Sequence, residues 1–274
     1  MTKIALTALA ETLPSTVPFV GPETQERAVG REFVARLGAN ESVFGPSPRA
    51  IAAMGHAASE VWKYGDPENY DLRQALAAHH GIDPGHIMVG EGIDGLLSYL
   101  VRLLVEPGTP VVTSKGGYPT FNYHVSGYGG VLHMVPYAAD HEDPATLIAK
   151  ARDVSAKMVY FANPDNPMGS WHNSDAVQAL IDAMPDTTLL VLDEAYVELA
   201  PADTAPVLRP ETENVIRMRT FSKAYGMAGA RVGYAIGPKS LITAFDKLRN
   251  HFGMSRISQA GALAALADQD YFNS

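Results

Sequence analysis

Residues 220–231 read TFSKAYGMAGAR and follow an apolar run, Val215, Ile216 and Met218, that predicts a β-strand. The stretch sets Lys223 between a serine and small residues where the chain leaves this strand. A lysine in a desolvated pocket beside other cations loses affinity for protons, and its neutral amine can condense with an aldehyde as a Schiff base. Ser222 and Arg231 supply a hydroxyl and a fixed charge that can hold a phosphate. The stretch therefore fits an aldehyde cofactor that carries a phosphate, with a solvated loop lysine as the alternative.

A pattern of strand, turn and helix repeats from Ile87 onward, and it predicts an α/β fold. Continuous apolar strands such as TLLVL, residues 188–192, are typical of a mostly parallel sheet covered by helices on both faces. The predicted strands are Ile87–Val89, Pro110–Ser114, Val131–Pro136, Met158–Ala162, Thr188–Leu192, Val215–Thr220 and Val232–Ile236. The predicted helices are Arg49–Trp62, Asp71–His80, Leu96–Val105, Pro144–Arg152, Ser174–Met184 and a long stretch from Pro238 towards Asp268 with a bend at Gly253.

The composition excludes several classes of function. The chain has 274 residues and a formal charge of -9, from 21 basic and 30 acidic residues, which argues against nucleic-acid and anionic-membrane partners. It has no cysteine, and its nine histidines show no close ligand spacing, so we expect no metal site. No apolar run reaches the ~18 residues of a membrane span, and we expect a cytoplasmic protein.

The stretch GEGIDG, residues 90–95, follows a strand and begins a helix. Its glycines let backbone N–H groups approach a phosphate, and the helix N-terminus adds a favourable dipole. A dinucleotide site also needs an acidic residue about 20 positions later, at the end of the next strand. That strand ends in Thr113, Ser114 and Lys115, so we interpret the turn as a phosphate cradle for a cofactor other than NAD.

Other polar or aromatic residues follow the predicted strands in the same way. Asp193, in LLVLDEAY, could pair with a pyridinium nitrogen, or cap the next element. Asn166, in NPDNP, and Tyr196 could donate hydrogen bonds to a phenolic oxygen on the same ring. Phe121, in YPTFNY, could stack on a flat cofactor, although core packing explains a single Phe as well. Their occurrence in order, each just after a separate strand, predicts one site.

With these residues the chain resembles the fold-type I pyridoxal-5'-phosphate aminotransferases (class I/II), most closely the histidinol-phosphate aminotransferase group. The stretches that carry the resemblance are ANESVFGPSP, YGDP, GEGIDGLL, YPTFNY, NPDNPMG, VLDEAYVE and TFSKAYGMAGARVGY, which span about residues 36–237. The resemblance implies a seven-stranded-type sheet, pyridoxal 5'-phosphate as cofactor, and a homodimer.

The resemblance also implies a role for each site residue. Lys223 forms the Schiff base with the cofactor, Asp193 pairs with the pyridine nitrogen, and Tyr196 joins Asn166 at the phenolic oxygen. Phe121 lies over the ring. The phosphate is held by Gly92, the backbone amides of Ile93 and Asp94, Thr220, Ser222 and Arg231, together with Tyr64 of the neighbouring subunit. Asn40, Phe44 and Asn166 are implied to contact the substrate.

Two departures from the family pattern bear on the substrate. The family usually has NENPYG where this chain has NESVFG, so Phe44 lacks the hydroxyl that would help hold a substrate phosphate. Family members also continue into a C-terminal small domain with a substrate-binding arginine, and we expect this chain to be a fragment that lacks most of it. The expected division is an N-terminal arm at 1–35, a cofactor-binding large domain at 36–250, and the start of the small domain or an interdomain helix at 251–274.

The expected activity is transfer of an amino group between a 2-oxo acid and an amino acid or amino-alcohol phosphate, either histidinol-phosphate-like or aromatic. Two alternatives remain open at this point. A pyridoxal-phosphate decarboxylase of the same fold would use a similar site, and a non-catalytic cofactor-binding fragment would retain the same residues.

Overall fold

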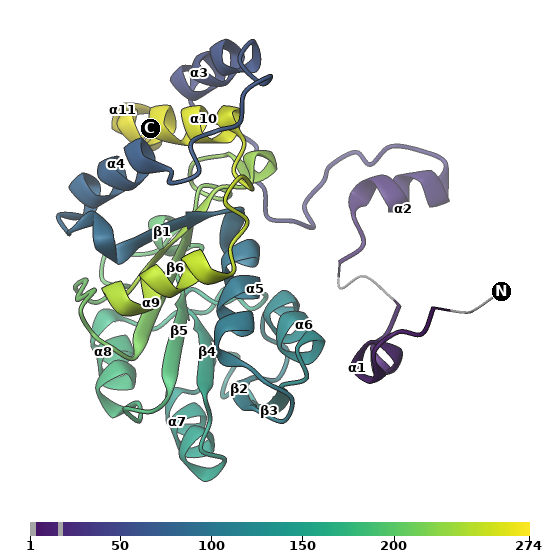
Figure 1. The fold of residues 1–274 in the computed structure, drawn as a ribbon, viewed down its shortest axis with the longest axis vertical. Coiled ribbons are helices and arrows are strands. Elements are labelled where there is room, and N and C mark those ends of the chain that lie inside the picture. Colours follow the sequence, from purple (N-terminus) through teal and green to yellow (C-terminus); the bar gives the residue numbers. More distant parts are fainter. Residues whose placement is uncertain (1–3, 16–18) are drawn as a thin grey trace.

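The computed structural model describes residues 4–15 and 19–274. Residues 1–3 and 16–18 of the predicted arm lie outside the described residues. One seven-stranded sheet with the strand order β1-β7-β6-β5-β4-β2-β3 forms the centre of the molecule (Figure 1). Its strands are β1 Ile87–Gly90, β2 Pro110–Ser114, β3 Val131–Val135, β4 Met158–Ala162, β5 Leu189–Asp193, β6 Val215–Thr220 and β7 Gly233–Ile236.

Strands β2 to β6 pair in parallel, and β7 runs antiparallel to both of its neighbours, β1 and β6. The mostly parallel α/β fold is therefore confirmed. Three predicted strands match the observed bounds at both ends, three others differ by one residue at one end, and the strand predicted at 188–192 is shifted by one residue. Continuous apolar runs predicted these strands well because a central strand buries both of its faces.

The helices of the described chain are α1 Ala8–Thr12, α2 Pro22–Val29, α3 Pro48–Ala58, α4 Tyr70–His80, α5 Gly92–Leu104, α6 Pro119–Gly127, α7 Pro144–Asp153, α8 Ser174–Ala183, α9 Lys239–Ala244, α10 Arg256–Ala267 and α11 Gln269–Phe272. Helix α6 was not predicted, and α5 begins inside the stretch predicted as a turn. The long helix predicted from Pro238 towards Asp268 is wrong. A 3-10 turn at Phe245–Lys247 follows α9, and Ser255 caps a separate α10 by accepting the N–H of Ser258 at 3.1 Å.

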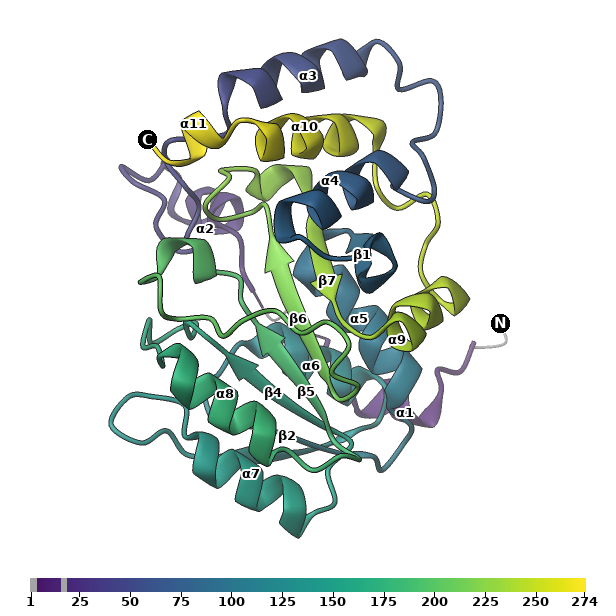
Figure 2. The ribbon, with the colours of Figure 1, turned by 90° about the vertical axis from the view of Figure 1, so that its left-hand side faces the viewer.

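Side chains of the sheet alternate between two apolar layers. In β4, Met158 and Tyr160 face a core that includes α5, α6 and α9, whereas Val159 and Phe161 face a core that includes α7 and α8. This alternation follows from the two-residue period of a strand. Helices therefore cover both faces of the sheet, as Figure 2 shows.

A further apolar cluster joins the β1–β7 edge of the sheet to α3, α4 and α10. Helix α10 lies directly beneath α3 (Figure 2). The two helices approach closely at Gly261, where an added Cβ would lie 2.6 Å from Cγ of Met54. Residues 251–274 thus pack on the body through α10, and the division into domains stays a prediction.

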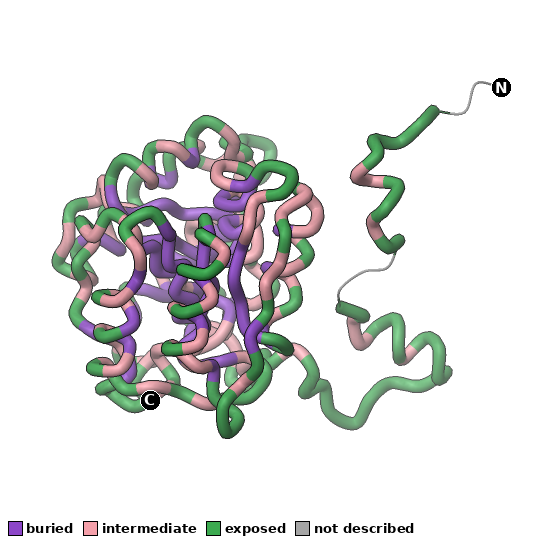
Figure 3. Tube along the Cα trace, turned by 90° about the horizontal axis from the view of Figure 1, so that it is seen from below, coloured by how far each residue is buried: buried purple, intermediate pink, exposed green. Residues whose placement is uncertain are grey.

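Most of the described part of the arm runs away from the body, so that α1 and α2 stand apart from the sheet and its helices (Figures 1 and 3). Arg36 bonds to Glu23 and Glu26 of α2 and ties the base of this arm to its helix. Most of the arm's described residues are exposed.

Candidate active site

A cavity of about 520 Å³ lies at the carboxyl ends of β4, β5 and β6, the end at which parallel sheets bind ligands. Its volume is in the range of small-molecule sites, ~300–1,000 Å³. The structure brings ten of the predicted site residues to this cavity. They are Asn40, Ile93, Asp94, Asn166, Asp193, Tyr196, Thr220, Ser222, Lys223 and Arg231.

One end of the cavity is built to receive an anion. Helix α5 begins at Gly92, and its cap residue Glu91 makes no side-chain hydrogen bond to the first turn. The backbone N–H groups of Ile93 and Asp94 lie in this first turn, so they are available to a ligand. The helix dipole favours negative charge at the same place.

Arg231 adds a cation at this end of the cavity. Its Nη1 donates to Oγ of Ser222 at 3.2 Å and to the carbonyl of Ala228 at 3.0 Å. A Cβ on Gly92 would lie only 2.3 Å from Nη2 of Arg231, so only glycine lets the guanidinium pack against the start of α5. Gly92 also has φ +77°, which suits glycine. Gly92 therefore shapes the cradle without lining the cavity.

The hydroxyls of Thr220 and Ser222 complete this end. Thr220 Oγ1 accepts the backbone N–H of Ser222 at 3.0 Å and lies 2.9 Å from its Oγ. Both residues are buried. The cradle thus combines a guanidinium, hydroxyls and the N-terminal amides of a helix, the groups that bind phosphate in proteins.

A buried carboxylate lies elsewhere on the cavity wall. Asp193, the last residue of β5, is 5% exposed. Its Oδ1 accepts the N–H of Ala195 at 2.9 Å, and its Oδ2 accepts the hydroxyl of Tyr160 at 2.6 Å. Burial raises the pKa of Asp193 to about 6, against the effect of these hydrogen bonds. A cationic partner in the cavity would offset the cost of burying its charge.

Lys223 also lines the cavity. Its Nζ donates to the carbonyl oxygens of Ala39 at 2.8 Å and Asn40 at 3.4 Å, and lies 5.3 Å from the ring centre of Tyr196. The Tyr196 hydroxyl accepts the side-chain N–H of Asn40 at 3.1 Å. A segment from the N-terminal side of the chain therefore covers the lysine, and the amine faces the same space as the carboxylate and the cradle.

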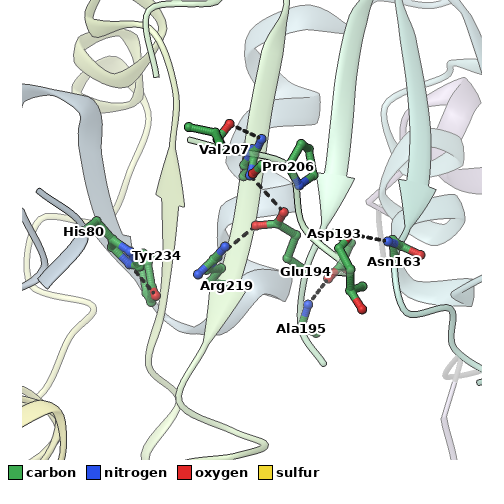
Figure 4. A network of polar contacts seen from close by, with 11 residues as sticks. His80, Asn163, Asp193, Glu194, Ala195, Pro206, Val207, Arg219 and Tyr234 are labelled. Carbon is green, nitrogen blue, oxygen red and sulfur yellow. Dashed lines mark hydrogen bonds and ion pairs between the residues drawn. The ribbon is translucent and has the colours of Figure 1, made fainter. Parts of the chain in front are cut away.

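A buried ion-pair network holds together the strand ends that carry these groups (Figure 4). Glu194, next to Asp193, accepts Nε of Arg219 at 2.8 Å and Nη1 of Arg217 at 3.3 Å. Arg217 also donates to the carbonyl oxygens of Pro206 and Val207. Because both arginines lie on β6, the network fixes the end of β5 beside the end of β6.

Comparisons with known proteins agree with this geometry. The family described as "Aminotransferase class I and II" matches residues 33–274. The chain belongs to this family. A histidinol-phosphate aminotransferase of Anaeromyxobacter sp. (strain Fw109-5) is 38% identical over 255 residues, which are 92% of this chain and 70% of the relative. A histidinol-phosphate aminotransferase of Jannaschia sp. (strain CCS1) is 36% identical over 248 residues, 90% of this chain and 69% of the relative.

A solved structure of the histidinol-phosphate aminotransferase from Sinorhizobium meliloti in complex with pyridoxal-5'-phosphate is 59% identical. Its TM-score is 0.93, and the match covers 98% of this chain and 72% of that one. The resemblance read from the motifs is thus confirmed, as are the enzyme class and the cofactor of the family.

The residues of this aminotransferase fit that cofactor. The cradle at Gly92 and Arg231 suits its phosphate, since a Cβ at Gly92 would fill the space that the guanidinium occupies. The buried Asp193 carboxylate suits a protonated pyridine nitrogen, and the Lys223 amine faces the cavity between polar groups. The assignment of individual roles to these residues stays a prediction.

Phe121 does not line the cavity in this structure, and its stacking on the cofactor stays a prediction. Phe121 lies on the inner face of α6, has no exposed surface and stacks on Tyr160, with 4.6 Å between ring centres. The aromatic residue of the same stretch that lines the cavity is Tyr118, directly before α6. Recognising the helix would have found it, because Pro119 at the first helical position leaves Tyr118 in the loop after β2.

Two further predicted residues lie outside the cavity. Phe44 is 87% exposed, and Tyr64 is 76% exposed with its ring against Phe252. The site of this one chain therefore does not include them. Sequence reasoning also missed Tyr160, which lines the cavity and bonds to Asp193. Because Tyr160 lies within an apolar strand, the sequence pattern indicated only that it belongs to the hydrophobic core.

Among the described residues, no helix combines the length and apolar character that crossing a membrane requires.

Proposed function

We propose that this aminotransferase moves an amino group between a 2-oxo acid and an amino compound of the histidinol-phosphate or aromatic type. The observation that carries the proposal is the meeting in one cavity of a lysine amine, a buried carboxylate and a phosphate cradle. The names of the relatives support the substrate class.

Each group has a role in this proposal. Arg231, Ser222 and the first amides of α5 bind the cofactor phosphate, and Asp193 holds the ring nitrogen. Asn166 and Tyr196 donate to the phenolic oxygen. When bound, pyridoxal 5'-phosphate supplies an electron-accepting ring that stabilises negative charge beside the substrate nitrogen. Lys223 supplies the amine, and its Nζ acts as the base that removes and returns a proton.

We further propose a homodimer, in which Tyr64 of one copy reaches the cofactor phosphate of the other. The exposure of Tyr64 and its position outside the cavity support this, since the side chain is free to contact a second chain. We also propose that the reaction takes place in the cytoplasm.

The alternative activity is decarboxylation, which the same fold and a similar cavity would allow. Substrate orientation decides between the two reactions, because the bond that breaks must align with the π orbitals of the electron-accepting ring. A non-catalytic cofactor-binding chain is the third possibility.

The test is an amino-transfer assay on the purified chain with pyridoxal 5'-phosphate, histidinol phosphate and 2-oxoglutarate. We expect glutamate to form, and we expect none with the Lys223→Ala variant. Phenylalanine and tyrosine as donors measure the aromatic part of the substrate class. Release of carbon dioxide without glutamate would replace the proposal by a decarboxylase, and a bound cofactor with neither product would indicate a non-catalytic chain.

A further inference from the structure

Tyr160 is the one residue whose hydroxyl makes a hydrogen bond to the Asp193 carboxylate in the described part of the chain. The bond to Oδ2 is 2.6 Å long, and the tyrosine also lines the cavity. Since Ala195 occupies Oδ1, each carboxylate oxygen has one protein donor and keeps a further acceptor site for a ligand.

The surrounding structure fixes the direction of this hydroxyl. Tyr160 is 1% exposed in the middle of β4, and its ring lies against that of Phe121 with 18° between their planes. A ring held in this way cannot turn without opening the core. The hydroxyl is therefore aimed at Asp193 before any ligand arrives.

The electrostatics of the site make this hydrogen bond the main protein contribution that favours the ionised carboxylate. Burial raises the pKa of Asp193, and the hydrogen bond from Tyr160 is the largest cause that lowers it, followed by the Ala195 N–H. Among the charged neighbours, Glu194 raises the Asp193 pKa and Lys223 lowers it. Glu142 and Tyr118 are also close enough to Asp193 for their charges to interact. Burial and the adjacent carboxylate raise the pKa of Tyr160 itself, so it stays a donor.

We propose that Tyr160 is a positioning residue of this aminotransferase. Its hydrogen bond to Asp193 determines whether the proton shared with the cofactor stays on the ring nitrogen or moves to the carboxylate. The proposal rests on the proposed function. A carboxylate that accepts a strong hydrogen bond is a weaker base, so the shared proton stays on the ring nitrogen. Without the tyrosine hydroxyl, Asp193 becomes the stronger base and takes the proton from the ring. A ring nitrogen without its proton withdraws electrons less well.

The test is the ¹⁵N chemical shift of ring-labelled pyridoxal 5'-phosphate bound to the wild-type chain and to Tyr160→Phe. The variant keeps the ring that stacks on Phe121 and removes only the hydroxyl. We expect a protonated ring nitrogen in the wild type, and in the variant a shift towards the unprotonated value. Tyr118→Phe is the matched control, because it removes another tyrosine hydroxyl of the cavity that makes no hydrogen bond to Asp193.

The outcomes separate this inference from the proposed function. Equal ¹⁵N shifts in the wild type and Tyr160→Phe would overturn the role of Tyr160 while leaving the aminotransferase proposal intact. Failure of the wild-type chain to bind the labelled cofactor would overturn the proposed function itself. Near-ultraviolet circular dichroism of the cofactor-free variant checks that its fold is native. The cofactor dissociation constants of the wild type and the variant show whether both proteins are saturated with cofactor when their ¹⁵N shifts are compared.

Discussion

At the scale of single residues, the site contains a conflict between folding and function at Asp193. The cavity needs a carboxylate, but burial favours the neutral acid and raises its pKa from 3.8 to about 6. In the cofactor-free protein the native state therefore binds a proton more tightly than the unfolded chain does. The contribution of this proton to stability is complete below pH 3.8 and is lost as the pH rises through about 6.

We predict that Asp193→Asn stabilises the cofactor-free chain at pH 8. One pKa unit corresponds to ~1.4 kcal/mol, so the gain in unfolding free energy is up to about 3 kcal/mol. The gain should vanish near pH 4, where the wild-type carboxyl is neutral. Urea unfolding at the two pH values measures it, and equilibrium dialysis should show weaker cofactor binding by the same variant. A variant less stable than the wild type at pH 8 would contradict this account.

Residue identities could be predicted from the sequence where a polar side chain directly follows an apolar strand. Asp193 and Lys223 were found in this way, because the ends of parallel strands converge. The position of Phe121 could not be predicted, because a single aromatic residue in a sequence does not indicate whether its side chain faces the core or a cavity. Tyr160 was hidden by its strand, because a buried tyrosine and a buried phenylalanine have the same place in an apolar pattern.

At the scale of elements, a second buried acid joins the loop after β4 to the neighbouring strands. Glu142 accepts the Ser114 hydroxyl from the end of β2 at 2.5 Å and the N–H of Ala162 from the end of β4 at 2.9 Å. The backbone carbonyl of Glu142 lies 2.8 Å from Nε2 of His172 in the loop after β4, and Asp165 of the same loop raises the pKa of Glu142. A protonated Glu142 therefore supports the loop that carries Asn166 into the cavity.

The pH dependence of this contact follows from its burial. Desolvation raises the pKa of Glu142 from 4.5 to about 8, with Asp165 and Asp193 adding to the effect. Tyr137 donates to Asp165, and His172 contacts the backbone carbonyl of Glu142. Because the folded-state pKa is the higher one, the native protein gains stability from this proton at low pH and loses it as the pH rises towards about 8.

We predict that Glu142→Gln makes thermal stability less dependent on pH. Glutamine keeps the size of the side chain and an oxygen that can accept a hydrogen bond, but it cannot ionise. Melting temperatures of the cofactor-free chain between pH 5 and pH 9 should fall with pH in the wild type and less steeply in the variant, which becomes the more stable of the two at pH 9. Glu213→Gln, at an exposed position, is the control and should follow the wild type. Parallel curves for all three would refute the role of Glu142.

Elements could be predicted where one pattern dominates, as in the strands, and less well where helices are short or broken. The stretch after Pro238 has helical periodicity on both sides of the break, but the caps at Ser255 and the 3-10 turn at Phe245–Lys247 divide it. Helix α6 contains four aromatic or β-branched residues among its nine, which lowers helix propensity, and its burial against the sheet overrides that preference.

At the scale of the whole molecule, one surface remains apolar around the exposed Tyr64. Two neighbours in the sequence, Val61 and Trp62, are more than half exposed. Phe252 is also more than half exposed, and its ring centre lies 4.7 Å from that of Tyr64. Exposed apolar side chains that lie together, as Tyr64 and Phe252 do, are typical of an interaction site. The proposed second copy of the chain would cover it.

We predict that Tyr64→Phe weakens cofactor binding although Tyr64 lies outside the cavity of its own chain. A hydrogen bond to a charged group contributes ~1.5–3 kcal/mol, so the dissociation constant should rise about tenfold or more. Tyr70→Phe, which removes the hydroxyl of an exposed tyrosine at the start of α4, is the control. Unchanged cofactor affinity in a chain that sediments as a dimer would contradict the contact across the interface.

The central claim is that Lys223 is the amine that reacts with the cofactor, and reduction with borohydride followed by peptide mapping tests it most directly. The chain is loaded with pyridoxal 5'-phosphate, reduced, digested and analysed by mass spectrometry. We predict a phosphopyridoxyl group on the peptide that contains Lys223, and none on the exposed Lys115 after excess cofactor is removed. Modification confined to other lysines, in a chain that binds the cofactor stoichiometrically, would contradict the claim.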